Sequence, residues 1–116
     1  MFANTITLTV NSIAKTLTRV NQDNFGSTYK YTSATELIQL QFRNSAEQNV
    51  RGVIDRHNLF IEWTVLATPT TPEYYVSASS TLRARRGTDP AMLSYLSSGT
   101  ATILAANLAG LIQGES

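Results

Sequence analysis

The chain has 116 residues, a formal net charge of +1 and a charged fraction of only 15%. This length predicts one domain with a modest core, and the near-neutral charge identifies no partner through bulk electrostatics. The absence of cysteine excludes disulfides and thiolate metal sites and suits a reducing compartment. The sequence begins without signal-peptide features, and its longest apolar stretch, residues 101–112, is too short to span a bilayer, so a soluble intracellular product is expected.

The first two predicted strands form a hairpin at about residues 4–20. Residues 5–10 alternate apolar and polar side chains, and Asn11 with Ser12 supplies turn chemistry. Residues 13–20 follow as a second strand, but its apolar positions share a side with Lys15 and Arg19. We therefore expect one of the two strands to be poorly buried.

The segment at about residues 28–86 is predicted to form an antiparallel sheet. Residues 21–27 have loop composition, and residues 27–33 predict a short strand near an edge. Residues 36–43 and 56–67 alternate as longer strands, with a loop over residues 44–49 between them. Two prolines then predict a loop that cannot join a ladder, and residues 73–85 form the last strand. The residues of that proline-containing loop are Thr68, Pro69, Thr70, Thr71, Pro72 and Glu73.

Two helices are predicted at about residues 89–113. Asp89 is an N-cap residue, and Pro90 occupies the first helical position. Ser98 and Gly99 interrupt the pattern, and Thr100 then caps a second helix that ends near Gly114. The second helix has the clearest helical periodicity in the chain, carried by Leu104, Leu108, Leu111 and Ile112.

Strands followed by helices predict an α+β fold whose antiparallel sheet is covered on one face. The second predicted helix is about 21 Å long at 1.5 Å per residue. Two short helices can hardly cover a sheet of this width. Either the hairpin or a second subunit must contribute, so the layout alone leaves dimerisation as one of two options.

The sequence contains little that suggests catalysis. His57 is the only histidine, and no cysteine or second histidine could join it as a metal ligand, so a structural or surface role is favoured. No GxSxG, GxGxxG or Walker motif is present, and no cofactor is implied. The chain is therefore interpreted as a non-enzyme, with a small hydrolase on an α+β sheet kept as an alternative.

Residues 76–87, VSASSTLRARRG, place a row of hydroxyls and then arginines on one face of the last strand. These arginines could simply be solvated charges that blunt a sheet edge. If the three long strands adjoin, however, the polar row continues across them with only Glu62 negative, and such a face suits single-stranded RNA. The face comprises Gln39, Gln41, Arg43, Arg56, Asn58, Phe60, Glu62, Thr64, Tyr75, Ser77, Ser79, Thr81, Arg83 and Arg85.

Three segments carry a resemblance to a known family. They are NTITLTVNSIAKTLTRV, IDRHNLFIEWTVLATPTTPEYY and RRGTDPAMLSYLSSGTATILAANLAGLI. In their layout they resemble the coat proteins of single-stranded RNA bacteriophages, the leviviruses. The resemblance covers nearly the whole chain and rests on the order of elements rather than on one short motif.

The resemblance implies an interlocked dimer whose two sheets join edge to edge, with the helices crossing onto the partner's sheet. Leu104, Leu108, Leu111 and Ile112 would then lie at the dimer interface, and residues 68–73 would make contacts between dimers. It also implies an icosahedral T=3 shell that packages genomic RNA, assembled in the bacterial host cytoplasm and located in the virion. Many relatives also bind an RNA hairpin that represses replicase translation.

The same resemblance assigns the inward sheet face to RNA. Apart from Thr64, the residues of the polar row are carried over as RNA-facing candidates. Tyr75 occupies a strand position where an RNA-stacking tyrosine occurs in the family. The alternative interpretation is a non-viral RNA-binding module with the same exposed face.

Overall fold

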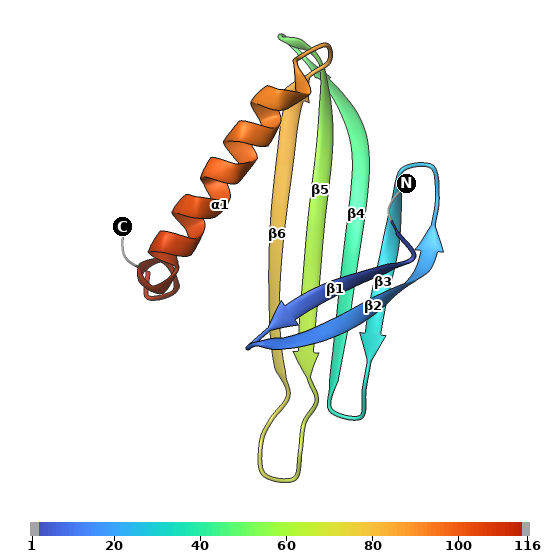
Figure 1. The fold of residues 1–116 in the computed structure, drawn as a ribbon, viewed down its shortest axis with the longest axis vertical. Helices are drawn as coiled ribbons and strands as arrows, with labels where there is room; N and C mark the ends of the chain where they lie inside the picture. The colour runs from blue at the N-terminus through green and yellow to red at the C-terminus, as the bar shows by residue number, and fades with distance from the viewer. Residues whose placement is uncertain (1–2, 115–116) are drawn as a thin grey trace.

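The computed structural model describes residues 3–114 and contains one six-stranded antiparallel sheet and one C-terminal helix (Figure 1). Each strand pairs with the next along the chain, so β1 and β6 are the edge strands. The ends of the predicted single domain, residues 1–2 and 115–116, lie outside the described residues. The elements are β1 Thr5–Val10, β2 Ile13–Gln22, β3 Gly26–Thr32, β4 Glu36–Asn49, β5 Gly52–Val65, β6 Tyr74–Arg85 and α1 Pro90–Ile112.

The predicted N-terminal hairpin is confirmed. Asn11 and Ser12 both adopt positive φ angles, 51° and 64°, as the two central residues of a tight hairpin turn require. β2 pairs with β3 through its second half, and the register shifts between Arg19 and Asn21. The hairpin consequently crosses one face of the sheet instead of extending it (Figure 1).

The core lies beneath this hairpin. Leu17, Tyr29, Ile38 and Leu40 form a buried cluster contributed by β2, β3 and β4. Partly buried apolar side chains of β1 and β5 pack around it. The expectation of one poorly buried strand holds in part. β2 buries Leu17 fully and leaves Lys15 only 8% exposed, but most of its other residues, Ile13 and Val20 included, are exposed.

The central hairpin β4–β5 is longer than the sequence predicts. The two strands pair without a break from Glu36↔Val65 to Asn49↔Gly52, so the predicted loop over residues 44–49 is wrong. The ladder is made by backbone groups and continues although the side chains there no longer alternate. β3 was also expected near an edge, but it lies between β2 and β4.

Gly26 allows β3 to approach β4 closely. A Cβ atom at this position would lie 2.1 Å from the carbonyl oxygen of Phe42, a distance that no side chain tolerates. Glycine is therefore required here for the close backbone approach.

The C-terminal region is one continuous helix, so the prediction of two helices is wrong. Asp89 does cap it, since its carboxylate accepts a hydrogen bond from the Ala91 N–H at 3.0 Å. The helix continues through Ser98 and Gly99, which weaken a helix but do not stop it. Thr100 does not cap a second helix; its hydroxyl donates to the Leu96 carbonyl at 2.8 Å, within the same helix.

Helix α1 leaves the end of β6 and diverges from the sheet (Figure 1). None of its residues is buried. By length and hydropathy the whole helix meets the requirement for crossing a membrane, which corrects the expectation that no apolar segment is long enough. The same length and composition suit a helix whose apolar surface packs on another protein chain.

Candidate nucleic-acid interface and subunit contacts

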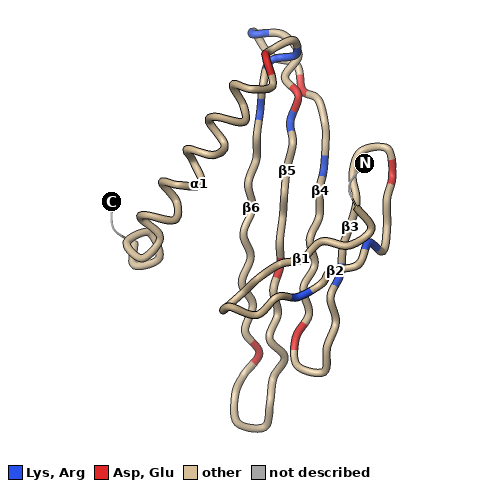
Figure 2. Tube along the Cα trace, in the orientation of Figure 1, with Lys and Arg blue, Asp and Glu red and all other residues tan. Residues whose placement is uncertain are grey.

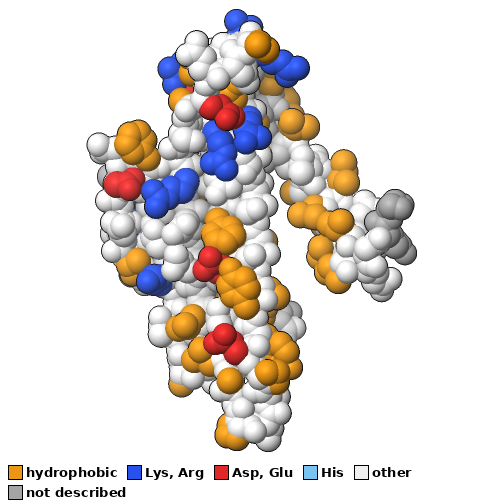
Figure 3. Space-filling view, turned by 180° about the vertical axis from the view of Figure 1, so that it is seen from behind, with side chains coloured by type: hydrophobic (Ala, Val, Ile, Leu, Met, Phe, Trp, Pro, Cys, Tyr) orange, Lys and Arg blue, Asp and Glu red, His pale blue; other side chains and the backbone are white. Residues whose placement is uncertain are grey.

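Strands β4, β5 and β6 adjoin, as the interpretation of the polar row requires. We call the face opposite the N-terminal hairpin the polar face. Figure 3 is turned by 180° from Figure 1 and looks onto this face. All of the predicted RNA-facing side chains share it, because the register aligns them in rows across the strands. The rows are Thr64–Tyr75, Gln39–Glu62–Ser77, Gln41–Phe60–Ser79, Arg43–Asn58–Thr81 and Arg56–Arg83, and Arg85 follows Arg83 on the same face of β6.

Strand β3 extends the polar face by two side chains that the sequence analysis missed. Lys30 pairs with Gln39, and Thr28 pairs with Gln41, so both lie on this face. Their alternation with the inward-facing Tyr29 is visible in the sequence. The expected edge position of this strand, however, separates it from the polar row.

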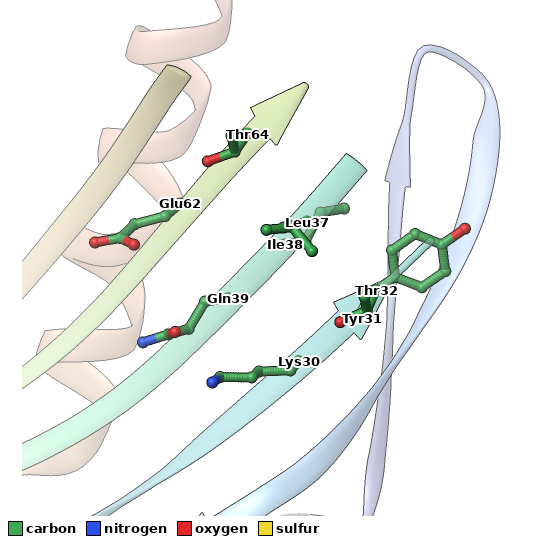
Figure 4. A pocket seen from close by; sticks show the side chains of 8 residues that line it. All are labelled: Lys30, Tyr31, Thr32, Leu37, Ile38, Gln39, Glu62 and Thr64. Carbon is green, nitrogen blue, oxygen red and sulfur yellow. The ribbon is translucent and has the colours of Figure 1, made fainter. Parts of the chain in front are cut away.

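A shallow hollow of about 190 Å³ lies on the polar face where β3, β4 and β5 meet. Figure 4 shows Lys30, Gln39 and Glu62 projecting from neighbouring strands around it. Together they offer an ammonium, an amide and a carboxylate, which can donate to and accept from the edges of a nucleobase. The hollow is partly open to solvent, so a splayed single-stranded base could reach it.

The polar face carries more negative charge than expected. Glu47 joins Glu62 on it because β4 extends to Asn49, so the expectation that only Glu62 is negative is wrong. Glu47 and Arg83 form an ion pair, with 2.9 Å between Glu47 Oε1 and Arg83 Nε. Asp23 Oδ2 lies 3.6 Å from Arg43 Nη1. Two of the predicted RNA-facing arginines are thus engaged with carboxylates.

Neutral hydrogen bonds hold other side chains of the polar face. The Asn58 amide donates to the Thr81 hydroxyl at 2.9 Å and to the Ser80 carbonyl at 3.2 Å. This fixes the amide across β5 and β6 while leaving its oxygen as an acceptor.

Basic residues gather along the chain at the end of the sheet where the β4–β5 turn meets β6 (Figure 2). Arg51 and Arg85 line a hollow of about 480 Å³ there, together with Arg83 and Glu47. On the opposite face Arg86 donates to Asp55 at 2.8 Å. This hydrogen bond holds the pKa of Asp55 below its usual value and raises the pKa of Arg86.

His57 lies on the face opposite the polar face, where its Nδ1 is 2.7 Å from Asn44 Oδ1. Within residues 3–114, no cluster of three or more His, Cys, Asp or Glu side chains could hold a metal ion. The histidine therefore belongs to a side-chain hydrogen bond on the hairpin side of the sheet.

Besides the outer edge of β1, two surfaces stay uncovered within residues 3–114: the outer edge of β6 and the apolar surface of helix α1. β6 pairs only with β5, and Tyr74, Tyr75 and Val76 at its start are each more than half exposed. Helix α1 exposes a series of apolar side chains that includes the predicted interface residues. These are Met92, Tyr95, Leu96, Ile103, Leu104, Leu108, Leu111 and Ile112.

The predicted loop between β5 and β6 is confirmed in position. Thr68 and Thr71 hold it in a turn: the Thr68 N–H donates to the Thr71 carbonyl at 2.9 Å, and the Thr71 N–H donates to the Thr68 hydroxyl at 3.0 Å. The loop forms the tip of the sheet farthest from the start of α1 (Figure 1).

Comparison with known proteins gives a family match over the strands. A family model described as "Phage phiCb5, coat protein" matches residues 3–85. The coat protein of bacteriophage EMS014 has a similar fold, with a TM-score of 0.71 and 23% identity over 90% of this chain and 74% of that one. A virus-like particle of bacteriophage EMS014 matches with a TM-score of 0.65 and 22% identity, over 86% and 71% of the two chains. No curated protein matches.

Proposed function

The chain belongs to the phage phiCb5 coat protein family, and we propose that it dimerises, assembles into a closed icosahedral shell and packages single-stranded RNA. Membership in a coat protein family implies a structural role in a phage capsid rather than an enzymatic one. It also disfavours the non-viral RNA-binding module. Assignment to the leviviruses, a T=3 shell and assembly in the host cytoplasm remain expectations from the sequence resemblance.

Dimerisation is supported by the unpaired edge of β6 and by the exposed helix α1 beside it. An unpaired edge strand presents free N–H and C=O groups to which a second copy of the same strand can add. An exposed apolar helix beside that edge gains hydrophobic free energy when a second subunit covers it. Edge pairing through β6 would place the helix of one subunit near the sheet of the other and satisfy both elements at once.

RNA packaging is supported by one observation above the others: the thirteen predicted RNA-facing side chains lie on a single face of three adjacent strands. The hairpin crosses the opposite face, so the polar face stays open (Figure 3). Its amides, hydroxyls, guanidinium groups and exposed Tyr75 match the contacts that single-stranded RNA makes with proteins. Binding of an operator hairpin would use the same surface with added sequence preference.

The proposal is tested by expressing the chain alone and examining the product by electron microscopy and sedimentation. We expect closed particles that contain host RNA protected from ribonuclease. Dissociation in acid or denaturant should release a dimer. A soluble monomer without particles would contradict the assembly proposal, and empty particles of normal shape would contradict RNA packaging alone.

A further inference from the structure

Two ion pairs lie at the same end of the sheet but on opposite faces. Glu47 pairs with Arg83 on the polar face at 2.9 Å. Asp55 pairs with Arg86 on the hairpin-side face at 2.8 Å. Replacing either acid with its amide raises the formal charge of the chain by the same amount, so the two positions form a matched pair for testing what the polar face does.

The Glu47–Arg83 pair sits within a cluster of like charges. Arg83 lies directly opposite Arg56 across β5 and β6, an arrangement that is unfavourable between free cations. Arg51 and Arg85 line the same hollow of about 480 Å³. The single carboxylate of Glu47 is therefore surrounded by more positive charge than it can neutralise.

We propose that this hollow, whose charged lining residues are Arg51, Arg83, Arg85 and Glu47, binds phosphates of the RNA backbone and that Glu47 competes with the RNA for Arg83. The proposal rests on the proposed function, since it requires RNA on the polar face. It adds Arg51 to the predicted contacts and assigns Glu47 an opposing role.

The exposure of the pair makes such an exchange feasible. The side chains of Arg83 and Glu47 are 56% and 47% exposed, and exposed pairs of this kind contribute little to stability. A phosphodiester oxygen offers the same charge-assisted hydrogen bonds as the carboxylate. A backbone phosphate can thus replace Glu47 on Arg83, while Arg51 and Arg85 bind neighbouring phosphates.

A site of this composition acts on the backbone and not on the bases. Guanidinium groups neutralise phosphates, which fixes the position of a strand without reading its sequence. The arginine-lined hollow lies at one end of the polar face. The separate hollow lined by Lys30, Gln39 and Glu62 offers hydrogen-bonding groups for base edges. The competition by Glu47 would keep this anchor weak and exchangeable, as packaging of a long RNA of varied sequence requires.

The test compares Glu47→Gln with Asp55→Asn in unassembled coat protein titrated with single-stranded oligouridylate over a range of salt concentrations. Glu47→Gln should tighten binding by up to about fivefold at low salt. It should also steepen the dependence of log K on log salt by up to about one unit, because Arg83 no longer exchanges one anion for another. Asp55→Asn should leave both quantities near the wild-type values.

Arg51→Gln should change both quantities in the direction opposite to Glu47→Gln: it should weaken RNA binding and reduce the salt slope. Thermal unfolding checks that each variant is folded. The proposed phosphate site is refuted if Glu47→Gln binds RNA like the wild type. It is also refuted if Asp55→Asn tightens binding equally, since the effect would then be one of net charge. Normal RNA binding with either of these results would leave the proposed packaging function intact. Loss of RNA binding by every variant, the wild type included, would overturn both proposals.

Discussion

Lys15 of β2 and Glu36 at the start of β4 form an ion pair that joins the N-terminal hairpin to the central sheet. Trp63 of β5 donates its indole N–H to Glu36 Oε2 at 3.0 Å, and the Lys15 ammonium lies 5.4 Å from the centre of the same indole. Three strands thus meet at one buried polar cluster. Since both charges are largely removed from water, each depends on the other.

Removing one of these charges should destabilise the subunit. Lys15→Met leaves the Glu36 carboxylate without its cation, and breaking a buried pair in this way costs roughly 3–5 kcal/mol. Urea unfolding at fixed protein concentration measures the loss, with the fluorescence of Trp63, the only tryptophan, as a local reporter. Lys30→Met is the control, because Lys30 is exposed on the polar face.

The double variant Lys15→Met, Glu36→Leu separates the cost of an unpaired buried charge from the cost of losing the ion pair itself. Replacing both charges with apolar groups removes the unpaired charge, so most of the stability lost in Lys15→Met should return. Equal stabilities for Lys15→Met and Lys30→Met would show that the ion pair does not fasten the hairpin.

Local patterns in the sequence predict much of this fold. The alternation of residues 5–10 and 73–85 predicts β1 and β6, and Asp89 with Pro90 predicts the start of α1. These features depend on neighbouring residues alone. The same alternation predicts the polar face, provided that β4, β5 and β6 adjoin, as they do.

Other features depend on distant parts of the chain and could not be predicted. The burial of Lys15 requires Glu36 and Trp63 from two other strands, so in the sequence it reads as an exposed charge. The second half of β4 is held by backbone pairing with β5, so its side chains show no strand pattern. Glu47 was consequently assigned to a loop and not to the polar face.

The Asp55–Arg86 pair predicts a weak dependence of stability on pH. The hydrogen bond from Arg86 lowers the folded-state pKa of Asp55 below its unfolded value of about 3.9. The contribution of ionised Asp55 to the free energy of unfolding should therefore be present above the unfolded pKa and be lost as pH falls through the lowered folded-state pKa. Carboxyl NMR titration should give a depressed midpoint for Asp55, which should return to the usual range in Arg86→Gln. An unchanged midpoint in that variant would show that Arg86 does not cause the shift.

Leu108 tests whether helix α1 needs a second subunit. Leu108 is 46% exposed in the single chain, so Leu108→Ala should cost little if the chain acts as a monomer. If a partner buries it, truncation should cost roughly 2–5 kcal/mol per buried side chain. We expect dissociated or insoluble protein by analytical ultracentrifugation and solubility assays. Val50→Ala is the control, because Val50 is a fully exposed aliphatic residue at the β4–β5 turn. A folded, soluble Leu108→Ala monomer would contradict the interlocked dimer.

Residues 68–73 are expected to act between dimers. Pro69 and Pro72 restrict the loop, and the bonds between Thr68 and Thr71 hold its turn. Replacing TPTTPE with a glycine–serine sequence should preserve the dimer, since the loop adds nothing to the core, but should lower particle yield. Dimer content and particle yield are measured separately by sedimentation. Particles at the wild-type yield would remove the loop from the assembly proposal.

Tyr75 and Arg83 should contribute to RNA binding in different ways. Tyr75 lies on the polar face and is 55% exposed, so its ring is available to stack on a base, a contact worth about 1–3 kcal/mol. Tyr75→Ala should weaken binding while leaving the salt slope nearly unchanged, and Tyr75→Phe should retain most of the affinity. Arg83→Ala should instead act through a phosphate contact. In the Glu47→Gln background, where no carboxylate occupies Arg83, it should reduce the slope by up to about one unit.

The neighbouring Tyr74 provides the control for exposure and ring loss. It is also 55% exposed, but it points to the opposite face of β6. Tyr74→Ala should therefore leave the affinity for single-stranded RNA unchanged, provided that sedimentation shows the same oligomeric state as the wild type. If Tyr75→Ala, Arg83→Ala and Tyr74→Ala all give the wild-type binding curve at every salt concentration, the polar face only keeps an exposed sheet soluble and does not contact RNA.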